Sequence, residues 1–138
     1  MDYTAEHIRQ DIATQADQEW SVSGADLRVR LDRLGLTPAQ FATITGSDDR
    51  TLRRMIAETL PVTRTTLARL AALEAEADEA IRDLTHDAAD GIPITLPRYL
   101  AKGATADTAR PASWWHAIAT RLLDQHPNAA FTYETEAS

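Results

Sequence analysis

The sequence predicts a mainly α-helical fold with a small α+β region at its C-terminal end. Apolar residues recur at helical spacing through most of the first 88 residues, between clear helix-start and helix-stop signals. After residue 88, prolines bracket a short β-type run, and a further amphipathic stretch precedes a second such run. The chain therefore divides into a helical extension over 1–22, a helical domain over 23–88 and a mixed region over 89–138.

Composition limits the classes of function. The 138 residues include no cysteine, so disulfides, a thiolate nucleophile and a cysteine-based metal site are excluded. The four histidines are scattered without metal-ligand spacing, and no pattern unites a nucleophile, a base and an oxyanion donor. We therefore expect no enzyme, metal or other cofactor. No apolar run approaches a membrane span and the N-terminus is acidic, so we expect a cytoplasmic protein without a membrane partner.

Charge is unevenly distributed along the chain. The formal net charge of −7 at pH 7 argues by itself against a nucleic-acid partner. Residues 24–70, however, hold eight arginines and five acidic residues, a net charge of +3. The rest of the chain holds six basic and sixteen acidic residues, a net charge of −10. A locally basic segment in an acidic chain is typical of a DNA-contacting face attached to a solvated module.

Two helices are expected before residue 36. Residues 4–20 have Thr4 as a candidate N-cap and apolar residues at i, i+4 spacing, which predicts a helix packed on the body of the protein. Residues 21–24 interrupt this pattern, and Ser23 can cap the next helix. Leucines at helical spacing mark one face of that helix, and Gly35 suits the left-handed conformation at its end.

The segment 37–57 predicts two short helices joined by a tight turn. Thr37 is a candidate N-cap, with proline at the first helical position and Gln40 three residues after the cap, which is a capping-box signature. Gly46 supplies the turn, and Asp48 is the expected cap of a helix over 48–57. This last helix is amphipathic, with Leu52, Met55 and Ile56 on one side and Asp49, Arg50, Arg53, Arg54 and Ala57 on the other.

A long helix is predicted over about 64–88, with Thr63 as its N-cap and Gly91 just beyond its end. Its outer face is strongly acidic, and we expect that face to be solvated rather than bound to a partner. Its apolar positions lie close to a heptad seam: Leu67, Leu70, Ala77, Ile81 and Leu84.

Two short strands and one helix are predicted after residue 91. Prolines bracket 94–96 as an edge-type strand, and Phe131 and Tyr133 alternate in a possible second strand. Between the strands, Ser113 is the candidate cap of a helix. We expect that helix to turn Trp115, Ile118, Ala119, Leu122 and Leu123 inward.

The third helix of the 24–70 segment has the properties of a DNA-reading helix. The major groove admits one α-helix, and arginine can bridge two acceptors on a guanine edge. Arg50, Arg53 and Arg54 form the polar face that such a helix needs. Two simpler interpretations stay open, because the arginines could be a solvated helix face and Asp49 could pair with Arg53 at i, i+4 instead of accepting from cytosine.

Two stretches also carry a resemblance to a known family. Residues 36–42 (LTPAQFA) and 46–55 (GSDDRTLRRM) resemble the helix-turn-helix of lambda-repressor-like regulators, the Cro/cI and xenobiotic-response-element group. The resemblance covers about a third of the chain and implies an N-terminal helix-turn-helix domain of about five helices. It implies base reading by Asp49, Arg50, Arg53 and Arg54, and phosphate contacts near Thr37, Gln40, Thr63 and Arg64.

The order of the expected elements from residue 24 to about 126 is similar to that of anti-CRISPR-associated regulators. In that group the part after the DNA-binding domain forms a homodimer, which represses its own operon through an inverted repeat. On a helix the adjacent Trp114 and Trp115 point about 100° apart, so that one could lie in the subunit and the other in a dimer contact, or one could simply be partly exposed. We therefore predict a homodimeric repressor on double-stranded DNA, with dimer contacts from Ile81, Leu84, Trp114, Trp115, Ile118 and Leu122.

Three alternatives stay open at this point. The same fold could serve an antitoxin or adaptor that binds a basic protein through its acidic surface. A monomeric repressor on an asymmetric site is a second alternative, and RNA binding is a third.

Overall fold

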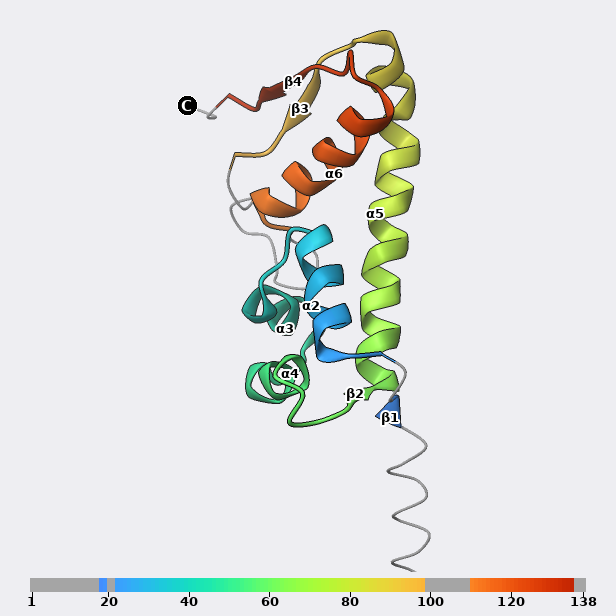
Figure 1. Ribbon diagram of the computed structural model, residues 1–138. Coiled ribbons are helices and arrows are strands. Elements are labelled where there is room, and N and C mark those ends of the chain that lie inside the picture. The colour runs from blue at the N-terminus through green and yellow to red at the C-terminus, as the bar shows by residue number, and fades with distance from the viewer. Residues whose placement is uncertain (1–17, 20–21, 99–109, 136–138) are drawn as a thin grey trace, which may run out of the picture.

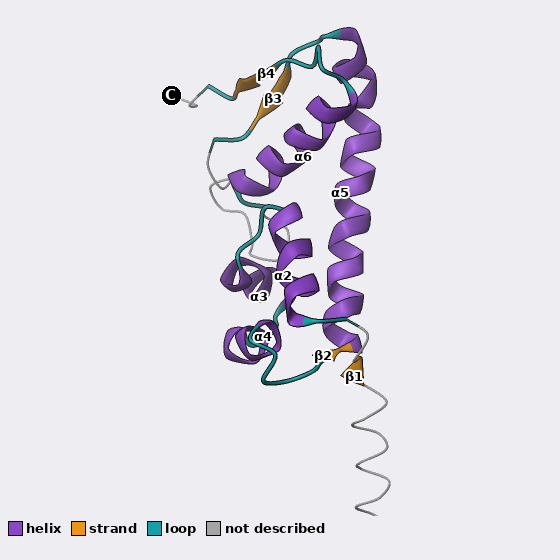
Figure 2. Cartoon of the chain, in the orientation of Figure 1, coloured by secondary structure: helices purple, strands orange, loops and turns teal. Residues whose placement is uncertain are grey.

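The computed structural model describes residues 18–19, 22–98 and 110–135. Within these ranges the chain is mainly helical with a few short strands, which confirms the prediction of a mainly α fold. The helices are α2 (Gly24–Arg33), α3 (Pro38–Thr45), α4 (Asp49–Ile56), α5 (Arg64–Asp90) and α6 (Ala112–Gln125). The strands are β1 (Gln18–Glu19), β2 (Val62–Thr63), β3 (Ile94–Leu96) and β4 (Phe131–Tyr133). Helix α5 runs the length of the described body, and the other helices lie along one side of it (Figures 1 and 2).

The first helices begin where the sequence predicts. Ser23 caps α2 and forms a capping box with Asp26, and Thr37 and Gln40 form the expected box at the start of α3. Each box satisfies a free backbone N–H group and holds the chain extended before the helix. Gly35 and Gly46 follow α2 and α3 with φ of 71° and 74°, so both helices end through the left-handed conformation that favours glycine.

One hydrophobic core joins the predicted domain 23–88 to the region after it. Leu27, Phe41 and Leu52 bring α2, α3 and α4 into the same buried cluster as Leu70 of α5. The cluster continues without interruption to Trp114 of α6 and into β3. The long helix α5 therefore packs against both the N-terminal helices and the C-terminal α+β region.

The acidic surface of α5 differs in part from expectation. Glu79 and Asp83 are exposed, as predicted for a solvated face, but three other carboxylates form ion pairs with arginines of other segments. Glu74 accepts two hydrogen bonds from Arg30 of α2. Glu76 pairs with Arg110 at 2.6 Å (Oε2 to Nε), and Asp78 pairs with Arg121 of α6 at 2.8 Å. The partners come from segments far along the chain, so they are not visible in the local charge pattern.

Two pairs of strands complete the fold. Strands β3 and β4 are parallel and pair Ile94 with Phe131, Thr95 with Thr132 and Leu96 with Tyr133. Both strands were predicted. Strand β1 pairs antiparallel with β2, so the predicted helix over 4–20 is wrong at residues 18–19, where pairing with a distant strand keeps the backbone extended. The other residues of that predicted helix, 4–17 and Trp20, lie outside the described residues.

Helix α6 begins earlier than predicted, and its inward face is only partly as predicted: Ile118, Ala119 and Leu122 are buried, but Trp115 and Leu123 are not. Pro111 is the N-cap residue and Ser113 lies in the first turn, so the predicted Ser113 cap is wrong. Trp114 is buried and Trp115 only partly buried, while Leu123 is 44% exposed. The face that packs inward is the i, i+4 stripe through Trp114, which leaves Leu123 on the flank.

This orientation changes the predicted dimer contacts. Ile81, Trp114, Ile118 and Leu122 are 6% exposed or less within the single chain. Their side chains fill the core of the subunit and are not available to a second copy in this conformation. Leu84 and Trp115 are partly buried against the same core. Among the predicted contacts, only Leu84 and Trp115 keep surface that a second copy could reach in this conformation.

The two glycines after α2 and α3 allow a matched test of the packing. A Cβ at Gly35 would lie 2.1 Å from the Ser113 carbonyl oxygen, whereas one at Gly46 would meet nothing within 4 Å. We expect Gly46→Ala to lower the free energy of unfolding by about 1–2 kcal/mol, the left-handed strain alone. Gly35→Ala must also displace α6 and should lower it by about 3 kcal/mol or more. Urea unfolding of both variants measures the difference, and equal losses would contradict the close approach of α6.

Candidate nucleic-acid interface

Helix α4 is fixed to the body by one face and exposes the other. Leu52 and Met55 are buried at 1% and 4% exposure, and the Thr66 hydroxyl of α5 donates to the Met55 sulfur at 3.5 Å. Successive residues of a helix rotate by about 100°, which places Arg50 and Arg54 on the side opposite these anchors. Both arginines are exposed.

The turn between α3 and α4 is held by α5. The Ser47 hydroxyl contacts the Thr45 hydroxyl at 2.7 Å and accepts a hydrogen bond from the Arg69 guanidinium at 2.8 Å. Sequence reasoning did not assign this role to Arg69, because nothing in the local pattern reveals which turn a helix side chain will reach. The contact links the turn before α4 to α5.

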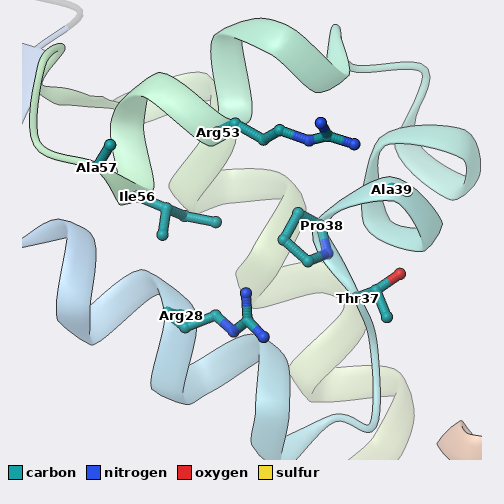
Figure 3. A pocket seen from close by; sticks show the side chains of 7 residues that line it. All are labelled: Arg28, Thr37, Pro38, Ala39, Arg53, Ile56 and Ala57. Atoms are coloured by element: carbon teal, nitrogen blue, oxygen red, sulfur yellow. The ribbon is translucent and has the colours of Figure 1, made fainter.

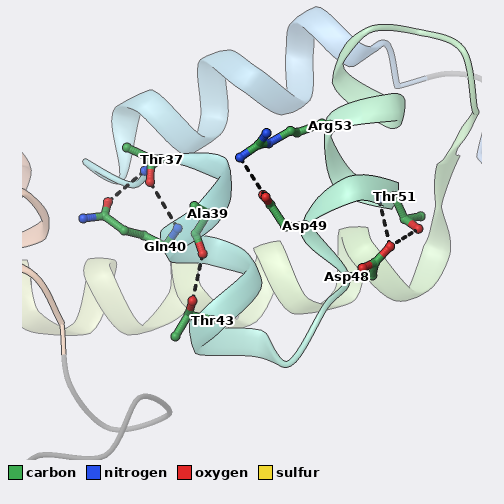
Figure 4. Close-up of polar contacts among 8 residues, drawn as sticks. All are labelled: Thr37, Ala39, Gln40, Thr43, Asp48, Asp49, Thr51 and Arg53. Atoms are coloured by element: carbon green, nitrogen blue, oxygen red, sulfur yellow. Dashed lines mark hydrogen bonds and ion pairs between the residues drawn. The ribbon is translucent and has the colours of Figure 1, made fainter.

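Two of the four predicted base-reading residues form a pair with each other. Asp49 and Arg53 make an ion pair at 2.8 Å between Oδ2 and Nη2 (Figure 4), which confirms the i, i+4 interpretation. The other oxygen of Asp49 is buried and has no hydrogen-bond partner among the described residues. By contrast, the guanidinium groups of Arg50 and Arg54 have no hydrogen bond or ion pair anywhere in the described part of the chain. Asp49 thus orients Arg53, while Arg50 and Arg54 are uncommitted.

Asp48 is the N-cap of α4, as predicted. Its carboxylate accepts from the Thr51 N–H at 3.0 Å and from the Thr51 hydroxyl at 2.7 Å. These hydrogen bonds lower the pKa of Asp48 from its ordinary 3.8, with smaller contributions from the charges of Arg50 and Arg54. The carboxylate is therefore a structural cap, and its negative charge partly offsets the two arginines.

A hollow of about 360 Å³ joins α4 to the start of α3 (Figure 3). Arg53 extends toward Pro38 and Ala39, and Arg28 of α2 approaches from the other side. The predicted phosphate-contacting residues Thr37 and Gln40 lie at this end of α3, where they make the capping box. The structure thus places two arginines, Arg28 and Arg53, near the N-terminus of α3. The sequence did not single out Arg28 as a site residue.

The other predicted phosphate-contacting residues lie at the start of α5. The Thr63 hydroxyl is engaged with the hydroxyl and the N–H of Thr66, as a helix cap. Arg64 is exposed. A hollow of about 200 Å³ is lined by Thr63 together with Asp48 and Thr51, so the start of α5 lies beside the start of α4. The predicted residues therefore flank α4 on two sides.

Comparison of the chain with protein-family models, with curated proteins and with solved structures returned no match. In the described ranges, no group of three or more histidine, aspartate or glutamate side chains is placed to hold a metal ion. A search of the same residues finds no helix with the length and apolar character needed to cross a membrane.

The cap of α4 gives a pH-dependent prediction. Because the folded-state pKa of Asp48 is lowered, its contribution to stability is present above the unfolded pKa of about 3.8 and is lost as the pH falls below it. Asparagine caps helices equally well but does not titrate there. We expect Asp48→Asn to lose less stability than the parent between pH 6 and pH 3, measured by urea unfolding. Parallel losses in the two proteins would show that the carboxylate is not held by Thr51.

Proposed function

We propose that this chain is a sequence-specific DNA-binding transcriptional repressor that acts as a homodimer on an inverted-repeat operator. In this proposal α3, the turn and α4 form a helix-turn-helix, and α4 enters the major groove of double-stranded DNA. One observation carries the proposal. Helix α4 holds Arg50 and Arg54 exposed and uncommitted on one face, while Leu52 and Met55 fix the opposite face in the core.

The arrangement of charge supports nucleic acid as the partner. The segment 24–70 carries a net charge of +3 in a chain of −7, and α4 lies within that segment. Part of the acidity elsewhere is neutralised by arginines outside that segment, because Glu76 pairs with Arg110 and Asp78 with Arg121. The remaining negative charge repels DNA from other surfaces and favours approach through α4.

The four predicted base-reading residues then divide into two roles. Arg50 and Arg54 are free to donate two parallel hydrogen bonds to guanine, the commonest specific contact in the major groove. Arg53 is held by Asp49 and extends toward the start of α3 (Figure 3), where a backbone phosphate fits better than a base edge. Asp49 acts on Arg53 and does not itself read DNA.

An antitoxin or adaptor function receives less support from the structure. That alternative needs an open acidic surface for a basic protein. Three of the α5 carboxylates that would supply it are engaged with arginines of the same chain, which reduces that surface to residues such as Glu79 and Asp83. We therefore prefer DNA as the partner.

The main test is the loss of specific binding when the uncommitted arginines are removed. The operator is first selected from a random DNA pool. We expect Arg50→Ala and Arg54→Ala each to weaken binding to the selected sequence by roughly 1–3 kcal/mol, with relaxed preference at one base position. Arg82→Ala is the matched control, because it removes an exposed arginine of α5 outside the 24–70 segment. No enrichment from the pool, or three variants that bind alike, would overturn the proposal.

Arg64 allows a separate prediction about phosphate contact. If its guanidinium meets the DNA backbone, Arg64→Ala should weaken binding to all sequences about equally. The slope of log affinity against log salt should also fall by about one. Fluorescence anisotropy across a salt series measures both. An unchanged slope would place Arg64 away from the DNA.

A further inference from the structure

The two-stranded sheet at the C-terminal end has two edges of different kinds. In the ladder between β3 and β4, the Ile94 N–H donates to the Ala130 carbonyl and the Glu134 N–H donates to the Leu96 carbonyl. With the parallel register, this pattern turns the backbone groups of Ile94 and Leu96 toward β4. The backbone groups of Thr95 on β3, and of Phe131 and Tyr133 on β4, point to the outer edges.

Prolines close the outer edge of β3. Alternation along a strand puts residues 93, 95 and 97 on that edge, and the first and last of these are Pro93 and Pro97. Proline has no N–H to donate, so only Thr95 retains one there. Such an edge cannot accept another strand in regular register.

The outer edge of β4, by contrast, has no partner strand within the described ranges. Phe131 and Tyr133 present both N–H and C=O groups, and no proline lies in β4. Tyr133 is 44% exposed, as is Leu123 on the adjacent flank of α6. A groove of about 270 Å³ runs between β4 and α6 and is lined by both residues. An open edge beside an apolar groove is the arrangement that accepts an added strand.

We propose that a second copy of this chain adds to the outer edge of β4 through its own β4, antiparallel and across a two-fold axis at Thr132. The choice of a second copy rests on the proposed function, which needs two reading helices related by a two-fold axis. The geometry of the edge makes the strand self-complementary. The result is a four-stranded sheet in the order β3, β4, and then β4 and β3 of the partner subunit.

The register at Thr132 pairs compatible side chains. Phe131 stands opposite the partner's Tyr133, and Tyr133 stands opposite the partner's Phe131. These two pairs exchange the four outward backbone hydrogen bonds. The two threonines at position 132 face each other as a pair without hydrogen bonds, and Glu134 stands opposite Ala130 of the partner subunit, so that no like charges meet. Aromatic cross-strand pairs of this kind are stabilising.

Single cysteines test this register directly, since the chain has no cysteine of its own. Thr132 and Thr95 are exposed neighbours in the ladder, so they form a matched pair. Cβ atoms of a central antiparallel pair without hydrogen bonds lie close enough for a disulfide. We expect Thr132→Cys to form a covalent dimer under mild oxidation and Thr95→Cys to stay monomeric on a non-reducing gel. A Thr132→Cys variant that does not cross-link, or equal cross-linking of both, overturns the register.

Solution mass tests the edge itself. The parent should have a mass near twice 15.2 kDa by light scattering. Tyr133→Pro removes an outward N–H and spares the ladder to β3, so it should raise the dimer dissociation constant at least tenfold. Thr95→Pro makes the same change on the closed edge and should leave the dimer dissociation constant unchanged. Tyr133→Val keeps the N–H and controls for loss of the aromatic ring. A monomeric parent, or a Tyr133→Pro variant that folds and dimerises like the parent, overturns the inference.

The two proposals fail separately. A dimer that cross-links at position 132 but enriches no DNA would overturn the proposed repressor and leave the edge pairing standing. A chain that binds a selected palindrome as a dimer but does not cross-link at position 132 would do the reverse.

Discussion

The packing of α5 against helices from both ends of the chain is the constraint on which the rest of the structure depends. Leu70, Leu73, Ala77 and Ile81 form the buried stripe of this helix. Two carboxylates of the same helix form ion pairs with its neighbours: Glu74 pairs with Arg30 of α2, and Asp78 pairs with Arg121 of α6. The Glu74 pair is only partly exposed, and it raises the pKa of Arg30 above its ordinary value, chiefly through the hydrogen bond to that carboxylate. Apolar packing supplies most of the stability, while the ion pairs fix how α2 and α6 are rotated about α5.

Local signals predicted the start of the fold well. The boundaries of α2, α3, α4 and α5 follow from caps whose hydrogen bonds span three residues, so a single sequence contains all the information they need. The same holds for the Asp49–Arg53 pair, which joins neighbours on one helix face. The candidate interface could be predicted to this extent because α4 is short and both of its faces are defined by residue type.

Contacts between distant segments could not be predicted in the same way. Part of the solvated face expected on α5 became a set of ion pairs because Arg110 and Arg121 come from the far end of the chain. The inward face of α6 was set by its packing on α5, which selected Trp114 over Trp115. The role of Arg69 at the turn before α4 depends likewise on the crossing of two helices. In each case residue type was informative, but the partner was determined by the tertiary arrangement.

The continuous core also bears on how a dimer of this kind would select DNA. In the proposed dimer the two-fold axis lies at β4, at one end of α5, while α4 packs near the other end (Figure 1). A flexible linker between these parts would let the two copies of α4 adapt to several half-site spacings. Here Leu27 of α2 and Leu122 of α6 belong to one buried cluster, which removes that freedom. Half-sites recur on one face of DNA only once per helical turn, about 34 Å apart. Operator spacing would therefore be set by the packing of α6 on α5, and the bases read would be set independently by Arg50 and Arg54.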